Sequence, residues 1–343
     1  MKKILFIVVA LIMVATFVGC TTSTAAEQTT TQATETTAAA AEQTTTTAEA
    51  TTEAGKVFKV AVSLPAANNA WQAKLLEFVN AEIAKETSGQ FDFTVKNAVD
   101  DADQLNILTT FKDGGYDLMV ILPGNGTLLT SICVQIYESG TKTVILDRGI
   151  ESDKYTCLLM GDNYGGGVNA ANYIGEFLGG KGDLAVLRSY VGTPIDLERY
   201  SGFTDTLKEK YPDMKILVEG DGEFNREAGL AAMTDILPAY DHIDGVYTQD
   251  DETALGAYNA IKNANRTDIK IITGFGGTKG AYELIKAGDP IYKASMSYFP
   301  SMGADGIRMA IKILKGEPFE KDNILPTYVV TTENVDQFME FAY

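Results

Sequence analysis

Hydrophobic residues recur along the first half of the chain with two periods, and this pattern predicts strands that alternate with helices. Short runs rich in β-branched and aromatic residues predict strands at 57–63, 91–97, 118–122 and 143–146. Between the first two strands, apolar residues follow at the four-residue spacing of an amphipathic helix, and a second helical pattern covers 105–111. The residues of the first helical pattern are Trp71, Leu75, Val79 and Ile83.

The same alternation restarts in the second half. Strands are predicted at 184–188, 215–219, 245–248, 269–275 and 293–297, with helices between them at 195–210, 226–237, 253–263 and 278–287. This order predicts an α/β fold with two doubly wound, Rossmann-like lobes, each a parallel sheet with helices on both faces. Ligands of such open sheets bind beyond the carboxyl ends of the strands, so the residues that directly follow the strands are the candidate site.

The first residues have the pattern of an export signal. Lys2 and Lys3 precede an apolar run over 4–18, and this run is short of the roughly 20 residues that span a bilayer. The stretch FVGC at 17–20 resembles a bacterial lipoprotein signal, so we expect a signal peptide at 1–19 and a lipid on Cys20. Two alternatives are a cleaved signal in which Cys20 is incidental and a retained membrane helix.

Residues 20–55 consist mainly of Thr, Ala, Gln and Glu after the cysteine. This segment lacks the aromatic residues from which a core is built, so we expect a disordered linker that tethers the remainder to the membrane. The remainder is long enough for two lobes with separate cores.

Composition excludes several classes of function. Across 343 residues, 46 acidic against 28 basic side chains give a formal charge of −18, which disfavours nucleic acid as a partner. The single histidine, His242, cannot supply a zinc site or a Ser-His-Asp triad built on several histidines, and no metal or cofactor is expected. Cys133 and Cys157 lie in apolar segments, so we expect two free thiols, with a disulfide as the alternative.

The glycine-rich and acidic motifs do not indicate an enzyme. The glycines at 175–182 follow a helix and lack the Ser or Thr of a phosphate-binding loop. Those at 274–280 follow a strand, but Lys279 occupies the place of the third glycine of a dinucleotide site, which favours a tight turn. The Asp250-Asp251-Glu252 cluster fits the start of a helix better than a metal or acid-base site.

Polar and aromatic side chains gather at the predicted strand ends. Aromatic rings can pack against the C–H faces of a small polyhydroxylated ring, and carboxylate, amide and guanidinium groups can form paired hydrogen bonds with its hydroxyls. Singly, each has another interpretation: core packing for the tryptophan and the phenylalanine, helix capping for the asparagines, and surface ion pairs for the arginines. The candidate ligand-binding residues are Asn68, Asn69, Trp71, Asp147, Arg148, Arg199, Phe224, Asp250 and Tyr298.

Five segments in this order and spacing resemble the type I periplasmic binding proteins of ABC sugar transporters, the ribose and galactose binding group. The resemblance covers nearly all of the predicted folded part. It lies in AVSLPAANNAW at 61–71, VILDR at 144–148, ERYSGF at 198–203, TQDDETALG at 248–256 and GFGGT at 274–278.

The resemblance implies a cleft between the lobes. Asn69, Trp71, Asp147 and Arg148 would line one wall, and Arg199, Phe224, Asp250 and Tyr298 the other. It also implies that the chain crosses between lobes near Asp162, Tyr298 and Thr327, so that 56–161 with 299–327 forms the first lobe and 162–298 with 328–343 the second.

The sequence departs from the family at two of its ligand positions. Gly276 stands where the family has an aspartate that grips sugar hydroxyls, and Tyr298 stands where ribose binders use an amide. The pocket is therefore altered relative to that of a ribose or galactose binder.

We therefore expect a monomeric lipoprotein, not an enzyme, on the outer face of the cell membrane. It would capture a small sugar and deliver it to an ABC import permease. The alternative is a sensory partner that presents its ligand to a membrane receptor or kinase. A weaker third hypothesis is a glycoside-cleaving enzyme that uses Asp147 and Asp250 as its two carboxylates.

Overall fold

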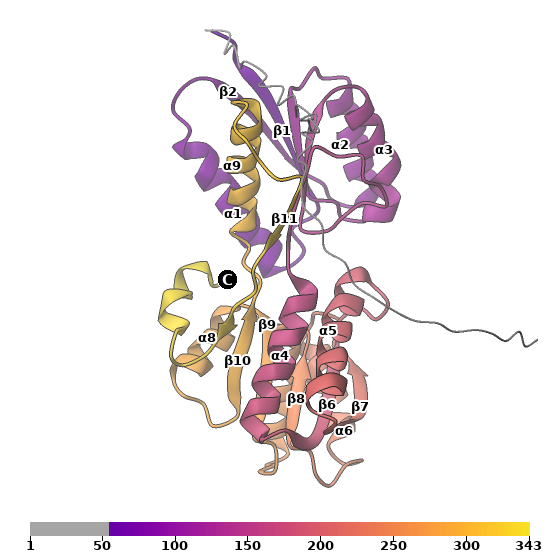
Figure 1. The fold of residues 1–343 in the computed structure, drawn as a ribbon, viewed down its shortest axis with the longest axis vertical. Helices are drawn as coiled ribbons and strands as arrows, with labels where there is room; N and C mark the ends of the chain where they lie inside the picture. Colours follow the sequence, from indigo (N-terminus) through magenta and orange to yellow (C-terminus); the bar gives the residue numbers. More distant parts are fainter. Residues whose placement is uncertain (1–54) are drawn as a thin grey trace, which may run out of the picture. The chain divides into compact units, whose positions relative to one another are not determined.

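The computed structural model describes residues 55–343, which form two α/β lobes (Figure 1). The first lobe is built on a six-stranded sheet of order β11-β5-β4-β3-β1-β2, and the second on a six-stranded sheet of order β12-β10-β9-β8-β6-β7. In the described chain the paired strands run parallel, apart from the antiparallel pair β10 and β12. The predicted fold class is confirmed.

The strands and helices alternate along the chain. The strands are β1 (Phe58–Leu64), β2 (Phe91–Asn97), β3 (Leu118–Ile121), β4 (Lys142–Leu146), β5 (Cys157–Gly161), β6 (Lys181–Arg188), β7 (Asp213–Asp221), β8 (Gly245–Thr248), β9 (Ile271–Gly276), β10 (Tyr292–Ser297), β11 (Asp322–Leu325) and β12 (Val329–Val330). The α-helices are α1 (Ala70–Lys85), α2 (Asp101–Lys112), α3 (Gly126–Glu138), α4 (Asn163–Leu178), α5 (Pro194–Lys210), α6 (Arg226–Ile236), α7 (Asp251–Asn263), α8 (Lys279–Lys286) and α9 (Met302–Leu314). Two short 3₁₀ helices, η1 (Val335–Gln337) and η2 (Met339–Phe341), follow β12.

The chain passes from one sheet to the other between β5 and α4, between β10 and α9, and between β11 and β12. Helix α9 therefore returns to the first lobe, where it lies beside α1 (Figure 1). The approach is close, because a side chain at Gly303 would meet Leu75 and Val79 at 2.9 and 2.8 Å. The single-residue lobe boundaries given above stay a prediction.

Most helices begin shortly after a strand, at a residue whose side chain caps the first turn. An N-cap oxygen that accepts a backbone N–H satisfies one of the free donors of the first turn. Such a cap begins each helix from α1 to α8, and the capping residues are Asn69, Asp100, Asn125, Asp162, Thr193, Asn225, Asp250 and Thr278. Several of these caps thus lie where a ligand of an open sheet binds.

Three further expectations concern single segments. Cys133 and Cys157 are buried free thiols, as expected. The signal peptide, Cys20 and all of the linker except Gly55 lie outside the described residues. Within 55–343, no helix combines the length and apolar character needed to cross a membrane.

Candidate ligand-binding site

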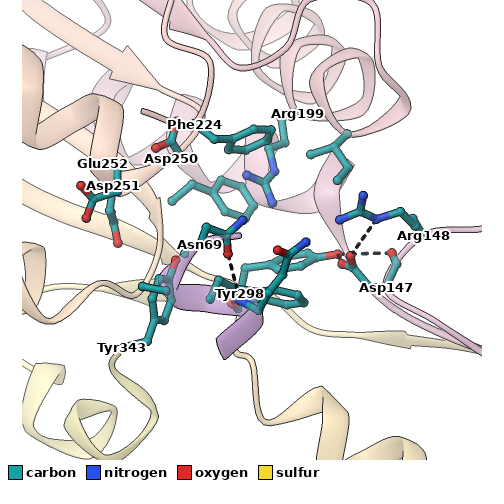
Figure 2. A pocket seen from close by; sticks show the side chains of 16 residues that line it. Asn69, Asp147, Arg148, Arg199, Phe224, Asp250, Asp251, Glu252, Tyr298 and Tyr343 are labelled. Atoms are coloured by element: carbon teal, nitrogen blue, oxygen red, sulfur yellow. Dashed lines mark hydrogen bonds and ion pairs between the residues drawn. The ribbon is translucent and has the colours of Figure 1, made fainter. Parts of the chain in front are cut away.

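A cavity of about 140 Å³ lies between strand ends and helix starts of the two sheets (Figure 2). An apolar cavity of roughly 150 Å³ in another protein holds one benzene ring, so this volume fits a ligand with a single six-membered ring. The cavity is lined by Asn69, Ala70, Trp71, Gln72, Asp147, Arg148, Ile195, Arg199, Phe224, Asp250, Asp251, Glu252, Phe275, Gly276, Tyr298 and Tyr343.

Every predicted ligand-binding residue except Asn68 lines this cavity. Asn68 is exposed just before α1, where its backbone N–H donates to the Gln72 side chain at 3.0 Å. Asn69 lines the cavity and also caps α1, with its Oδ1 accepting from Gln72 N at 2.9 Å. The cap uses one lone pair of this oxygen, and the side-chain amide NH₂ stays available as a donor.

Trp71 connects the two lobes. Its Nε1–H donates to the backbone oxygen of Tyr298 at 2.9 Å, and the two rings lie 6.0 Å apart at 38°. Trp71 is half-buried and also packs against the core of the first lobe. The Trp71 side chain therefore both packs against the core and forms part of the cavity wall.

Asp147, which follows β4, is clamped from both sides. Its φ of 64° lies in the left-handed region, and the residue is only 2% exposed. Oδ1 accepts from the Tyr298 hydroxyl at 2.8 Å, and Oδ2 accepts from Arg148 Nε at 3.1 Å (Figure 2). Arg148 also donates from Nη1 to the Gly124 oxygen at 3.1 Å and leaves 32% of its side chain exposed.

Arg199 is buried without a carboxylate partner among the described residues. It is 4% exposed, and its Nε donates to Asn163 Oδ1 at 3.0 Å while Nη1 donates to the Gln249 oxygen at 2.5 Å. The guanidinium carbon lies 3.6 Å from the centre of the Phe275 ring and 4.9 Å from that of Tyr298. Burial lowers the pKa of Arg199, which still stays cationic because arginine titrates far above neutral pH. Arg199 is therefore a cavity residue and not a surface ion pair.

Phe224 lines the cavity from the loop between β7 and α6. Its backbone φ of 51° is left-handed, as is that of Glu223 at 52°. The ring lies edge-on to Tyr190 at 5.7 Å, and Arg199 stands 5.9 Å from its centre. A non-glycine residue with positive φ is uncommon, so the loop is built in an unusual conformation that places this ring.

The acidic cluster begins α7, and two of its members are buried. Asp250 accepts from the backbone N–H of Thr253 at 2.8 Å and from its hydroxyl at 2.5 Å, and burial raises the pKa of Asp250 to about 7. Asp251 holds the turn after β9 by accepting from the backbone N–H of Gly277 at 2.7 Å. Glu252 pairs with Arg226 at 2.8 Å. The capping interpretation is confirmed for Asp250, and residues 55–343 contain no cluster of three or more metal-ligating side chains.

The sequence did not indicate some of the cavity residues. Phe275 lies at the end of β9, where the glycine pattern predicts only a tight connection, and Gly276 is noted for the side chain that it lacks. Asp251 and Glu252 were assigned only to helix capping. Ala70, Gln72, Ile195 and Tyr343 carried no signal of their own.

The family model described as "Periplasmic binding protein domain" matches residues 60–318. The chain belongs to this family. The predicted resemblance to type I periplasmic binding proteins is thereby confirmed.

Two curated relatives of this periplasmic binding protein illustrate its kinship. The ribose import binding protein RbsB of Bacillus subtilis is 28% identical over 277 residues, which cover 80% of this chain and 88% of the relative. The xylitol-binding protein of Mycolicibacterium smegmatis is 26% identical over 227 residues, which cover 66% of this chain and 64% of the relative.

Solved structures share the fold. The fructose binding periplasmic domain of a hybrid two component system has a TM-score of 0.72 at 28% identity and covers 82% of this chain and 93% of its own. A solute binding protein of an ABC transporter from Bacillus halodurans with bound myo-inositol has a TM-score of 0.75 at 22% identity and covers 84% and 99%. These relatives are binding proteins, and this periplasmic binding protein is likewise a binding protein and not an enzyme.

Proposed function

We propose that this periplasmic binding protein captures one molecule of a small, uncharged sugar or polyol in the cavity and delivers it to an ABC import permease. The observation that supports this proposal most is the make-up of the cavity. It combines arginine donors, aspartate acceptors and aromatic faces within a volume suited to one ring. Such a site meets the alternating hydroxyls and C–H faces of a sugar.

The charges of the cavity favour a neutral ligand. Arg148 is paired with Asp147, and Glu252 is paired with Arg226. The charge of Arg199 is opposed by the nearby charges of Asp250 and Asp147. Hydrogen bonds with a charged partner contribute about 1.5 to 3 kcal/mol each. Four or five of them are enough for micromolar affinity, which corresponds to about −8 kcal/mol.

Calorimetry tests this proposal directly. The protein is unfolded, dialysed and refolded to remove any co-purified ligand, and is then titrated with D-ribose, D-fructose, D-allose, xylitol and myo-inositol. We expect one-site binding with a micromolar Kd for at least one of them. Absence of heat with all five, in protein that has regained its circular dichroism, would contradict the proposal.

A second candidate is a sensory role, in which the closed, loaded form is presented to a membrane receptor. The similarity to the periplasmic domain of a hybrid two component system supports it. Uptake of the radiolabelled ligand separates the two candidates. Cells that lack this chain lose uptake if it feeds a permease, whereas they keep uptake and lose only the response to the ligand if it serves a receptor.

Export and a lipid on Cys20 belong to the same proposal, because a tethered domain outside the cell would collect solutes close to its permease. Labelling with radioactive palmitate and fractionation of cells test the anchor. Label and membrane association should both be lost in Cys20→Ala. A variant that stays labelled at the membrane would contradict lipidation at this residue.

A further inference from the structure

The cavity wall has no side chain at Gly276, which ends β9 and precedes the turn to α8. The φ of this residue is +127°, and a Cβ placed there would lie 2.4 Å from the hydroxyl oxygen of Tyr343. Both residues line the cavity. The tyrosine hydroxyl, which comes from a distant part of the sequence, therefore takes up the volume that a side chain at position 276 would need.

Tyr343 is fastened to the same turn by its backbone. The N–H of Lys279 donates to the Tyr343 oxygen at 2.8 Å, and the N–H of Tyr343 donates to the Gly277 oxygen at 3.4 Å. Figure 2 shows the ring standing at the cavity, on the same side as Asp251 and Glu252. The hydroxyl is thus held against the turn by bonds that do not involve the hydroxyl itself.

An aromatic cluster fixes the segment that precedes Tyr343. The ring of Phe299 lies 5.4 Å from that of Phe338 and 4.9 Å from that of Phe341, and Phe338 in turn lies 5.7 Å from Tyr328. These residues join η1 and η2 to the segments that follow β10 and β11. A side chain that is held in place before binding loses little freedom when a ligand arrives.

The Tyr343 hydroxyl is also available to donate a hydrogen bond to a ligand. The neighbouring carboxylate of Asp251 already accepts from the hydroxyls of Tyr292 at 3.0 Å and Ser295 at 2.7 Å, and from the backbone N–H groups of 277–278 at 2.7 and 2.8 Å. These bonds fill the roughly four acceptor sites of a carboxylate. Burial, together with the charge of Asp251, raises the pKa of Tyr343 well above its ordinary value. The phenol therefore stays protonated and remains a donor.

We propose that the Tyr343 hydroxyl contacts the ligand in place of a side chain at position 276 and determines specificity there. This inference rests on the proposed sugar or polyol binding. A carboxylate at this place would only accept hydrogen bonds, whereas a phenol also donates one. The site therefore admits a ligand oxygen that carries no hydrogen, such as a ring or carbonyl oxygen, which a carboxylate would repel.

Calorimetry on Tyr343→Phe tests the contact, with the five sugars and polyols named above as probes. The matched control is Tyr240→Phe, which removes a hydroxyl that donates to the Leu217 oxygen at 3.3 Å and does not line the cavity. A neutral hydrogen bond corresponds to roughly a three- to tenfold change in Kd. We expect that loss for Tyr343→Phe and less than about a twofold change for the control.

The outcomes separate this inference from the proposed function. If the unmodified protein binds a probe and Tyr343→Phe binds it equally well, the inference is wrong and sugar binding stands. If both variants weaken binding equally, the loss is a general effect of removing a hydroxyl and the inference is again wrong. If the unmodified protein binds none of the probes, both proposals fail together.

A stability measurement tests the geometry without any ligand. Gly276→Ala is made alone and in the Tyr343→Phe background, and the urea midpoints of the four proteins are compared. The backbone strain at positive φ is common to both backgrounds, but the collision with the hydroxyl exists only in one. We expect a clearly smaller drop in midpoint when the hydroxyl is absent. Equal drops would show that the hydroxyl does not fill this volume.

Discussion

The two walls of the cavity each carry an arginine, and these arginines are held in opposite ways. Arg148 in the first lobe leaves a third of its side chain exposed and forms an ion pair with Asp147 next to it in the sequence. Arg199 in the second lobe is almost fully buried and is held by an amide oxygen, a backbone oxygen and the face of Phe275. One arginine is balanced by a local charge, and the other is held by neutral hydrogen-bond acceptors and by packing.

This difference indicates how the walls divide the work. A buried cation whose direct hydrogen-bond partners are neutral retains more of its electric field than one that is exposed to water and paired with a carboxylate. Arg199 is therefore prepared for a ligand oxygen before binding, while Arg148 chiefly orients Asp147. We infer that the second lobe supplies the larger share of the affinity and that the first lobe completes the site.

We expect the largest effect on Kd when Arg199 and Arg148 are each replaced by alanine, one at a time. Arg199→Ala removes charged hydrogen bonds worth about 1.5 to 3 kcal/mol each, and we expect a Kd weaker by at least about a hundredfold. Arg148→Ala leaves Asp147 bonded to Tyr298, and we expect about a tenfold loss. Calorimetry with a sugar that binds the unmodified protein measures both.

Arg199→Lys is the control for charge alone. Lysine keeps the positive charge but lacks the planar fork that stacks on Phe275, so we expect it to rescue little of the affinity. If Arg148→Ala proves as damaging as Arg199→Ala, the walls contribute equally and the proposed division is wrong.

The aromatic faces provide the next test. Trp71→Ala removes the stacking face and the hydrogen bond to the Tyr298 oxygen, and we expect about a tenfold weaker Kd. Trp71→Phe keeps the aromatic face and loses the hydrogen bond, so its Kd should lie between that of the unmodified protein and that of Trp71→Ala. A loss of thermal stability in Trp71→Ala with unchanged affinity would identify Trp71 as core and remove it from the wall.

The smallest expected effect is a dependence on pH that comes from the second wall. The pKa of Asp250 is raised to about 7 by burial, whereas an unfolded aspartate titrates near pH 4. Between about pH 4 and 7 the native state thus holds more protons than the unfolded state. The contribution of Asp250 to stability is then fully present below about pH 4 and is lost as the pH rises through 7.

Ligand binding should follow the opposite trend. Ligand hydroxyls that donate to the Asp250 carboxylate favour its ionised form, so affinity should rise severalfold from about pH 5.5 to about pH 8. Calorimetry at several pH values, and urea unfolding without ligand, measure the two trends. Asp250→Asn should flatten both. A variant that keeps the full pH dependence would assign it to another group.

The sequence predicts those features of the fold and of the site that depend on residues close together in the chain. Apolar runs located β2 (Phe91–Asn97) and β8 (Gly245–Thr248) to the residue, and the polar residues after the strands marked most of the cavity lining. Both patterns are local, because the end of a strand and the cap of a helix each depend on only a few consecutive residues. The candidate site was therefore largely readable before the fold was known.

Helix α4 (Asn163–Leu178) shows how a tertiary contact overrides an unfavourable local composition. Three successive glycines at 165–167 disfavour a helix, yet the segment is helical. A Cβ at Gly167 would lie 2.2 Å from the backbone oxygen of Arg199, and one at Gly202 would lie 2.1 Å from that of Tyr164. The glycines allow α4 and α5 to approach closely, and this tertiary contact outweighs the poor helix propensity.

Tyr343 escaped prediction for a related reason. Its place in the cavity depends on contacts with the turn at 276–279 and on aromatic packing against Phe299. No residue near Tyr343 in the sequence announces these contacts. Strand β11 was missed likewise, since it joins the first sheet only after the chain has traversed the second.

The glycines that face tyrosines have a consequence for the evolution of this pocket. A Cβ at Gly161 would lie 2.2 Å from the ring of Tyr298, as one at Gly276 would lie 2.4 Å from the hydroxyl of Tyr343. Each tyrosine is thus tolerated only while its glycine persists, and a side chain can appear at either glycine only once the facing tyrosine has been replaced by a smaller residue. In descendants of this gene, loss of the tyrosine should therefore precede loss of its glycine, so that new ligand preferences arise in ordered pairs of substitutions.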